Sequence, residues 1–84
     1  MPRLSIISGY TIKSFGLRRN KETYEVIEYE GTTYKLEASF ELRRHRECYK
    51  LAQEISKERK VVLTTGMIEN RVWVGFQSTE TELK

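Results

Sequence analysis

The residues of this chain that are best suited to chemistry are His45 and Cys48, the only histidine and the only cysteine in the sequence. They stand three positions apart in a segment that we predict to be helical, so a thiol and an imidazole could meet there as a Cys/His nucleophile. Both positions also fall on the helix face that we predict to be buried, where a cysteine behaves as a small apolar side chain. We therefore expect no catalytic residue.

Other catalytic patterns lead to the same expectation. The sequence contains no aspartate, no glycine-rich phosphate loop and no metalloprotease motif. A zinc site needs three or four ligands, and one histidine, one cysteine and scattered glutamates do not supply them. We predict that the protein is not an enzyme and that it binds no metal and no cofactor.

Basic residues raise a second function class, the binding of nucleic acid. The candidates lie in a charged loop and on one stripe of the predicted helix: Arg18, Arg19, Lys21, Arg43, Arg46, Lys50 and Lys57. Such side chains bind phosphates, and aromatic residues on a sheet can stack bases. Glutamates beside the helical stripe neutralise much of it, and a net charge of +3 is modest for a dedicated nucleic-acid binder. Nucleic-acid binding is therefore the alternative hypothesis.

An apolar patch around the single tryptophan favours protein binding. Trp73 shares one face of a predicted hairpin with Arg71, Ile68 and Val62, which is the composition of an interface hot spot. The same patch could join two copies of the chain in a homodimer. In a second interpretation, Trp73 packs beneath residues 3–15 and the patch does not form. The sequence leaves both open.

Composition and charge limit the class of protein. Eighty-four residues allow one domain with a thin core. Residues 1–21 carry a net charge of +5, residues 22–41 of −5 and residues 42–60 of +4, so we expect faces of opposite sign that attract charged partners. One cysteine excludes an internal disulfide, and the sequence has neither a membrane-spanning run nor a signal-peptide pattern. We predict a cytoplasmic protein without a membrane partner.

The first half of the chain has the composition of β-strands. Residues 3–15 are rich in Ile, Tyr and Phe and are interrupted by a turn signal at Ser8-Gly9. Residues 16–22 are predicted to be a charged loop.

Residues 23–29 and 32–37 flank Glu30-Gly31, a hairpin turn in which glycine adopts a positive φ without steric cost. This turn pairs Ile27 with Tyr34 and Tyr29 with Thr32, and it also pairs Glu25 with Leu36. The apolar members of these pairs then share one face, which we expect to be buried.

The segment from Glu41 to Arg59 is the one convincing helix. Its apolar residues recur at helical spacing and form a single stripe of His45, Cys48, Leu51, Ala52 and Ile55. This stripe should pack on the sheet, with the charged stripes turned to solvent.

Residues 61–77 are predicted to form a second hairpin. A turn at Glu69-Asn70 places Met67 opposite Val72, Thr65 opposite Val74 and Leu63 opposite Phe76, which gives one continuous apolar face. Trp73 then lies on the other face with Arg71 and Gln77.

We predict an α+β fold in which a single helix packs on one face of an antiparallel sheet of about five strands, in the order ββ(β)αββ. Residues 1–77 form the domain, and residues 78–84 form a polar tail. The predicted function is that of a small non-enzymatic binding or regulatory module whose partner is a protein, itself included. Its size is that of the accessory proteins that phages and mobile elements encode.

Overall fold

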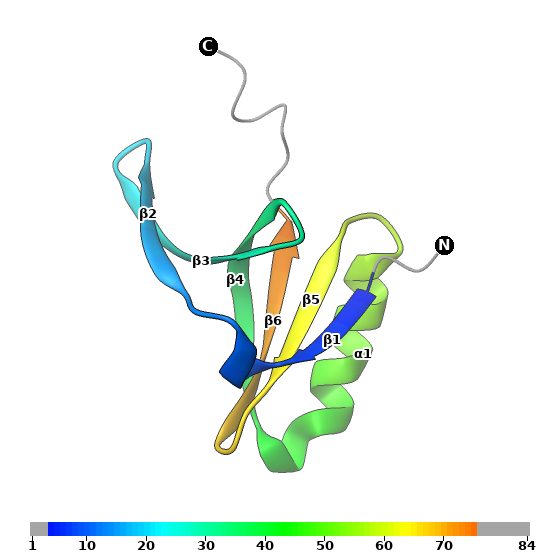
Figure 1. The fold of residues 1–84 in the computed structure, drawn as a ribbon. Helices are drawn as coiled ribbons and strands as arrows, with labels where there is room; N and C mark the ends of the chain where they lie inside the picture. The colour runs from blue at the N-terminus through cyan, green and yellow to red at the C-terminus, as the bar shows by residue number, and fades with distance from the viewer. Residues whose placement is uncertain (1–3, 76–84) are drawn as a thin grey trace.

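The computed structural model describes residues 4–75 of the chain. These residues form six strands and one α-helix preceded by a short 3₁₀ turn, with a second 3₁₀ turn near the N-terminal end (Figure 1). The strands are β1 (Leu4–Ser8), β2 (Phe15–Arg19), β3 (Glu22–Tyr29), β4 (Thr32–Glu41), β5 (Val61–Thr65) and β6 (Glu69–Gly75). The helical elements are η1 (Gly9–Thr11), η2 (Leu42–Arg44) and α1 (His45–Ser56).

The six strands make one sheet in the order β1-β5-β6-β4-β3-β2. All neighbouring strands are antiparallel except β1 and β5, which run parallel. The helix α1 packs on one face of this sheet (Figure 1). The predicted α+β class with one helix on a sheet is confirmed, whereas the predicted strand count and order are wrong. The predicted polar tail lies outside the described residues.

The extra strand comes from the segment that we predicted to be a charged loop. Its residues pair as the β2–β3 hairpin, which turns at Asn20-Lys21 with φ angles of 55° and 70°. Two successive left-handed residues are what a type I′ hairpin turn requires. Because β2 is an edge strand, its charged residue Arg18 is exposed to water, so a charged segment is compatible with a strand here.

The β3–β4 hairpin forms as predicted. Glu30 and Gly31 turn with φ angles of 51° and 81°, and the ladder pairs Ile27 with Tyr34 and Tyr29 with Thr32. The described ladder ends before the predicted pair of Glu25 with Leu36. The expectation that the apolar residues of this hairpin share a buried face is confirmed.

A β-bulge in β4 changes the face of the sheet to which the even-numbered residues of this strand point. The pairing of β4 with β6 shifts by one residue between Leu36 and Ala38. One extra residue reverses which side chains point to which face. Tyr34 and Leu36, before the bulge, pack on the face away from α1, whereas Phe40, after the bulge, packs against the helix core.

The first core lies between α1 and the sheet. Its members are buried residues of α1, β5 and β6: Cys48, Ala52, Val61, Leu63 and Val72. The predicted helical phase is confirmed for Cys48 and Ala52, and Leu51 and Ile55 pack at the edge of this core. It is wrong for His45, which is exposed at the first turn of α1 because the regular helix begins only there.

The β5–β6 hairpin differs in register from our prediction. Leu63 pairs with Val72 and Val61 with Val74, so the loop lies at residues 66–68 instead of at Glu69-Asn70. The shift is an even number of residues, so the side chains of the paired residues keep the faces that we predicted for them, whereas Met67 and Ile68 lie in the loop. The predicted partner of Leu63, Phe76, lies outside the described residues, as does Gln77.

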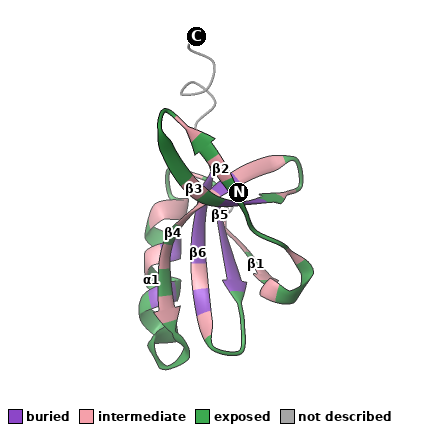
Figure 2. Ribbon diagram, turned by 90° about the vertical axis from the view of Figure 1, so that its left-hand side faces the viewer, coloured by how far each residue is buried: buried purple, intermediate pink, exposed green. Residues whose placement is uncertain are grey.

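A second core lies on the face away from α1, where residues 9–14 and the curled β2–β3 hairpin cover the sheet (Figures 1 and 2). Trp73 and Val62 are at its centre, and Trp73 is only 2% exposed. Ile7 and Ile12 pack against this core. The predicted exposed patch of Trp73 and Val62 is therefore wrong, and the interpretation in which Trp73 packs beneath the N-terminal segment is confirmed.

Candidate functional site

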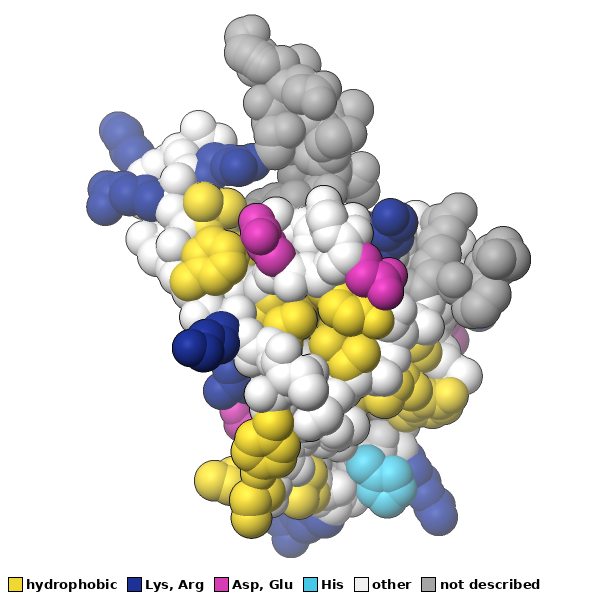
Figure 3. Space-filling model, in the orientation of Figure 1, with side chains coloured by type: hydrophobic (Ala, Val, Ile, Leu, Met, Phe, Trp, Pro, Cys, Tyr) yellow, Lys and Arg dark blue, Asp and Glu magenta, His cyan; other side chains and the backbone are white. Residues whose placement is uncertain are grey.

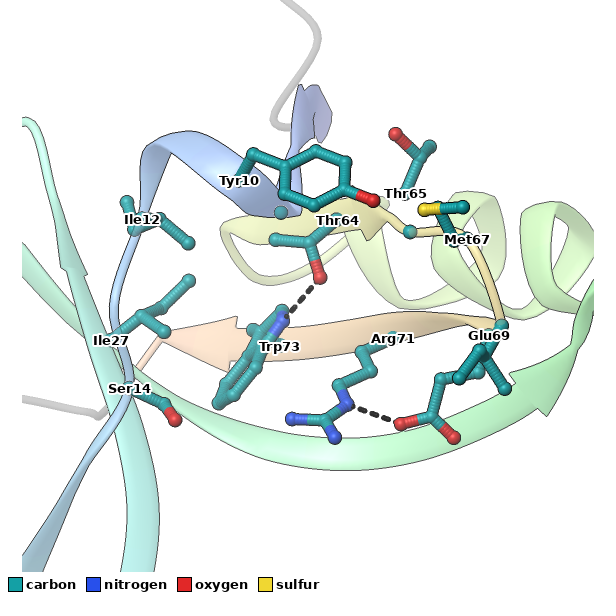
Figure 4. A pocket seen from close by; sticks show the side chains of 13 residues that line it. Tyr10, Ile12, Ser14, Ile27, Thr64, Thr65, Met67, Glu69, Arg71 and Trp73 are labelled. Carbon is teal, nitrogen blue, oxygen red and sulfur yellow. Dashed lines mark hydrogen bonds and ion pairs between the residues drawn. The ribbon is translucent and has the colours of Figure 1, made fainter.

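An open groove of about 560 Å³ lies where the second core reaches the surface. One wall is the segment of residues 9–14, and the other is the end of β5 with the loop of residues 66–68. Ile27, Arg71 and Trp73 form its floor, and in Figure 4 the indole of Trp73 lies between Ile27 and Arg71. Strands and turns that are far apart in the sequence thus build one concave surface.

The tryptophan in the floor is held in a fixed orientation. Its indole Nε1–H donates a hydrogen bond of 3.0 Å to the side-chain oxygen of Thr64, which is itself buried (Figure 4). A buried N–H that has a partner costs little, so the ring can lie buried beneath the groove and support its floor without leaving a polar group unsatisfied.

The rim of the groove carries three large apolar side chains that face solvent. Tyr10, Met67 and Ile68 are 73%, 77% and 82% exposed. Figure 3 shows hydrophobic surface at the lower left, where the β5–β6 hairpin turns in Figure 1. A contiguous apolar patch next to a concave surface is typical of an interaction site, whereas single exposed apolar residues are not.

Two glycines allow the walls of the groove to approach. A Cβ atom on Gly9 would lie 3.0 Å from the carbonyl oxygen of Thr65, and one on Gly66 would lie 2.9 Å from that of Glu69. Both contacts are with backbone atoms, which cannot swing aside. Glycine is therefore the residue that fits each position without a shift of the backbone.

The polar side of the groove is a chain of charged groups. Arg71 Nε donates 2.6 Å to Glu69 Oε2, and Arg71 Nη1 donates 3.2 Å to Glu25 Oε2. Ser14 Oγ donates 2.8 Å to the same Glu25 oxygen. The hydrogen bond to Glu69, together with the charges of Glu69 and Glu25, raises the pKa of the Arg71 guanidinium. Arg71 thus ties the loop before β2, the strand β3 and β6 together at one side of the floor.

The structure separates the four residues of our predicted protein-binding site. Arg71, Ile68 and Trp73 line the groove, whereas Val62 is fully buried below it. Our sequence reasoning missed Tyr10 and Met67. The available signals were an aromatic residue directly after the Ser8-Gly9 turn and a glycine followed by two apolar residues at 66–68, which we assigned to a strand.

The predicted nucleic-acid-binding residues do not form one surface. Arg18, Arg19 and Lys21 lie on the β2–β3 hairpin, which is far from α1 in both Figures 1 and 2.

The remaining cations lie on α1 and on the residues that flank it, and two of them are paired. Arg43 binds Glu41 at 2.8 Å, and Lys57 lies 3.7 Å from Glu54. Arg46 and Lys50 make no ion pair with any residue in the part of the chain that the structure describes. The free cationic surface on the helix is therefore small.

The Cys/His pair is not arranged as a nucleophile and its base. Cys48 is fully buried in the first core, and burial raises the pKa of its thiol. His45 is exposed, and its Nδ1 lies 3.3 Å from the carbonyl oxygen of Leu42. Within residues 4–75, no three His, Cys, Asp or Glu side chains are grouped in a way that could hold a metal ion. The thiol is best explained as part of the core.

No helix among the described residues is both long and apolar enough to cross a bilayer. Comparisons of the chain with protein-family models, with curated proteins and with solved structures find no significant match in any of the three.

Proposed function

We propose that this protein is a non-enzymatic binding module whose groove takes an apolar segment of a partner protein. The observation that carries the proposal is the exposure of Tyr10, Met67 and Ile68 around a floor formed by Trp73. The contact of these apolar side chains with water is unfavourable, so a partner that covers them gains the free energy of apolar burial. Methionine, in addition, adapts its shape to different partners.

The chemistry of the floor indicates what the bound segment should offer. Trp73 and Ile27 are closed to solvent and make the floor apolar, so we expect one or two large apolar side chains of the partner to pack over this floor against the exposed rim. Arg71 is shared between Glu69 and Glu25, so this side of the groove offers hydrogen bonds and a formal charge of only −1. We therefore expect the partner segment to be apolar at its centre and polar, without strong net charge, at its ends.

The proposal can be tested without knowledge of the natural partner. Random peptides displayed on phage are selected on the immobilised wild-type protein alone, and each selected peptide is then measured for binding to the double variant Met67→Ser/Ile68→Ser. Leu42→Ser is the matched control because Leu42 is an exposed apolar residue of η2 that does not line the groove. We expect the selected peptides to be rich in apolar residues. They should bind the control variant as they bind the wild type, and they should not bind the double variant. Peptides that bind all three proteins equally would exclude the groove as the site.

Nucleic acid is the alternative occupant, and the same variants distinguish it. Binding of random-sequence single-stranded DNA through Arg46 and Lys50 should weaken steeply with salt and be lost in the double variant Arg46→Ala/Lys50→Ala. It should not respond to Met67→Ser/Ile68→Ser. If DNA binding follows these expectations and no selected peptide depends on the groove, the basic residues of the helix, and not the groove, would be the binding site.

A further inference from the structure

The two edges of the sheet are protected to different degrees. The edge strand β2 contains Arg18 and Arg19, and charged residues are a common means of preventing an edge from pairing with another strand. The opposite edge strand, β1, has the sequence Leu-Ser-Ile-Ile-Ser, without a charge or a proline. Its five residues pair with β5 in unbroken register, so no bulge disturbs it either.

The outer side of β1 lies at the end of the sheet, and no strand among residues 4–75 pairs with it. Alternate residues of such a strand direct backbone N–H and C=O groups away from the sheet. These groups can be satisfied by water or by another extended chain. The geometry of the edge therefore specifies the shape of any protein that binds there, which is that of a β-strand.

A second groove of about 660 Å³ lies beside this edge, between β1 and α1. Leu4 and Ile6 form its strand side, and Tyr49 and Lys50 belong to its helix side. Ile6 is 51% exposed and Tyr49 is 43% exposed, so apolar surface faces solvent next to the unpaired backbone edge. An added strand would cover both at once.

The sequence of β1 allows it to pair with a second copy of itself, because none of its five residues is charged. Antiparallel pairing of two copies centred on Ile6 places Ile6 opposite its counterpart, Leu4 opposite Ser8 and Ser5 opposite Ile7. Directly opposite residues point to the same face, so Leu4 and Ile6 of both copies would lie on the side that carries α1. No like charges lie opposite each other within the paired β1 strands, and Tyr49 of each copy would flank the central isoleucines.

From this edge and groove we infer that β1 is the dimer interface of the protein, through which two copies join their sheets into one continuous sheet with a two-fold axis at Ile6. This interface is isologous, as in most homodimers. It is distinct from the groove at Trp73, which lies on the other face of the sheet. The inference does not depend on the proposed function, because peptide binding and self-association involve different residues.

The test is the mass of the full chain in solution, measured by light scattering over a concentration series that reaches the millimolar range. Ile6→Lys places two ammonium groups opposite each other at the axis and should raise the dimer dissociation constant by about tenfold or more. Phe15→Lys is the matched control, because Phe15 is 47% exposed on the other edge strand.

We expect a dimer for the wild type and for Phe15→Lys, and a monomer for Ile6→Lys at the same concentrations. A wild type that is monomeric throughout, or a dimer that Ile6→Lys leaves intact, would overturn the inference. Amide hydrogen exchange on the wild type gives a test that needs no variant. The protection of the β1 amides should rise with protein concentration, while that of the β2 amides should not. Protection of β1 that does not change with concentration would also overturn the inference.

Discussion

Trp73 and Thr64 lie diagonally across the β5–β6 hairpin, and the indole N–H of Trp73 donates a 3.0 Å hydrogen bond to the Thr64 side-chain oxygen. This contact joins the core to the candidate site. It satisfies the one polar group of a buried tryptophan and fixes the ring that forms the floor of the groove. Several properties of the protein should therefore respond to changes at Thr64.

Thr64→Val keeps the shape of the side chain and removes the acceptor of the indole N–H. The buried N–H then has no partner, and we expect the free energy of unfolding to fall by about 1–3 kcal/mol in urea titrations. Thr65→Val is the control, because Thr65 is exposed and should change stability by less than about 0.5 kcal/mol. Equal effects of the two substitutions would contradict the role of the hydrogen bond.

The packing of α1 predicts opposite outcomes for two neighbouring positions. Ile55 packs against the first core, and Ile55→Asp should lower the free energy of unfolding by more than about 2 kcal/mol because it brings a charge into apolar surroundings. Lys57 is exposed, and its ion pair with Glu54 spans 3.7 Å, so Lys57→Asp should be nearly neutral. Chemical denaturation of both variants checks the helical phase, which would be wrong if they behaved alike.

The loop of the groove depends on a glycine. A Cβ atom on Gly66 would lie 2.9 Å from the backbone oxygen of Glu69, so Gly66→Ala must displace the loop and should cost about 1–3 kcal/mol of stability. On Gly16 the nearest atom would be 3.7 Å away, and Gly16→Ala should be neutral or slightly stabilising. Thermal unfolding of the two variants measures the difference. A Gly66→Ala protein as stable as the wild type would mean that the loop is less constrained than described.

The stability of the protein should fall in alkaline solution partly because of Cys48. Burial raises the pKa of this thiol in the folded state, so the unfolded chain loses the proton first as the pH rises. The stabilisation is complete below the ordinary cysteine pKa of about 8.5 and is lost progressively above it. Burial also raises the pKa of Tyr34, which adds a further fall near its own, higher range.

Urea unfolding of the wild type and of Cys48→Ala from about pH 7 to about pH 10 separates these contributions. The variant should be less stable at neutral pH, because it leaves a small cavity in the first core, but its stability should decline less between pH 8.5 and 10. Parallel curves for the two proteins would show that Cys48 contributes nothing to the alkaline loss.

The parts of the fold that were predictable from the sequence are those with local causes. The β3–β4 hairpin follows from Glu30-Gly31, whose backbone conformation fixes the register of the residues beside it. The buried face of α1 follows from the spacing of Cys48 and Ala52. Each of these needs only interactions within a short segment of chain.

The parts that were not predictable depend on partners far away in the sequence. The parallel pairing of β1 with β5 joins the first strand of the chain to the fifth, and no local pattern marks it. The alternation of residues 61–77 fits two registers four residues apart, and the choice between them depends on where Gly66 can turn. The bulge at Leu36–Ala38 reverses the faces to which the side chains of β4 point, and no glycine or proline in the sequence signals it.

The candidate site was predictable in composition and not in geometry. Arg71, Ile68 and Trp73 were identified because their types are common in interfaces. Whether Trp73 is exposed depends on the cover supplied by residues 9–14, which no pattern within the hairpin reveals. Tyr10 and Met67 belong to the site only because that cover brings η1 to the end of β5.

The most direct test of the proposed groove is a two-dimensional amide NMR titration of the full chain with a peptide selected on the wild-type protein. The account predicts that the largest chemical-shift changes fall on residues 9–14 and 64–71, and that the indole N–H signal of Trp73, the only tryptophan, moves with them. Largest changes on α1 or on β1, with an unchanged Trp73 indole, would contradict the claim that this groove is the binding site.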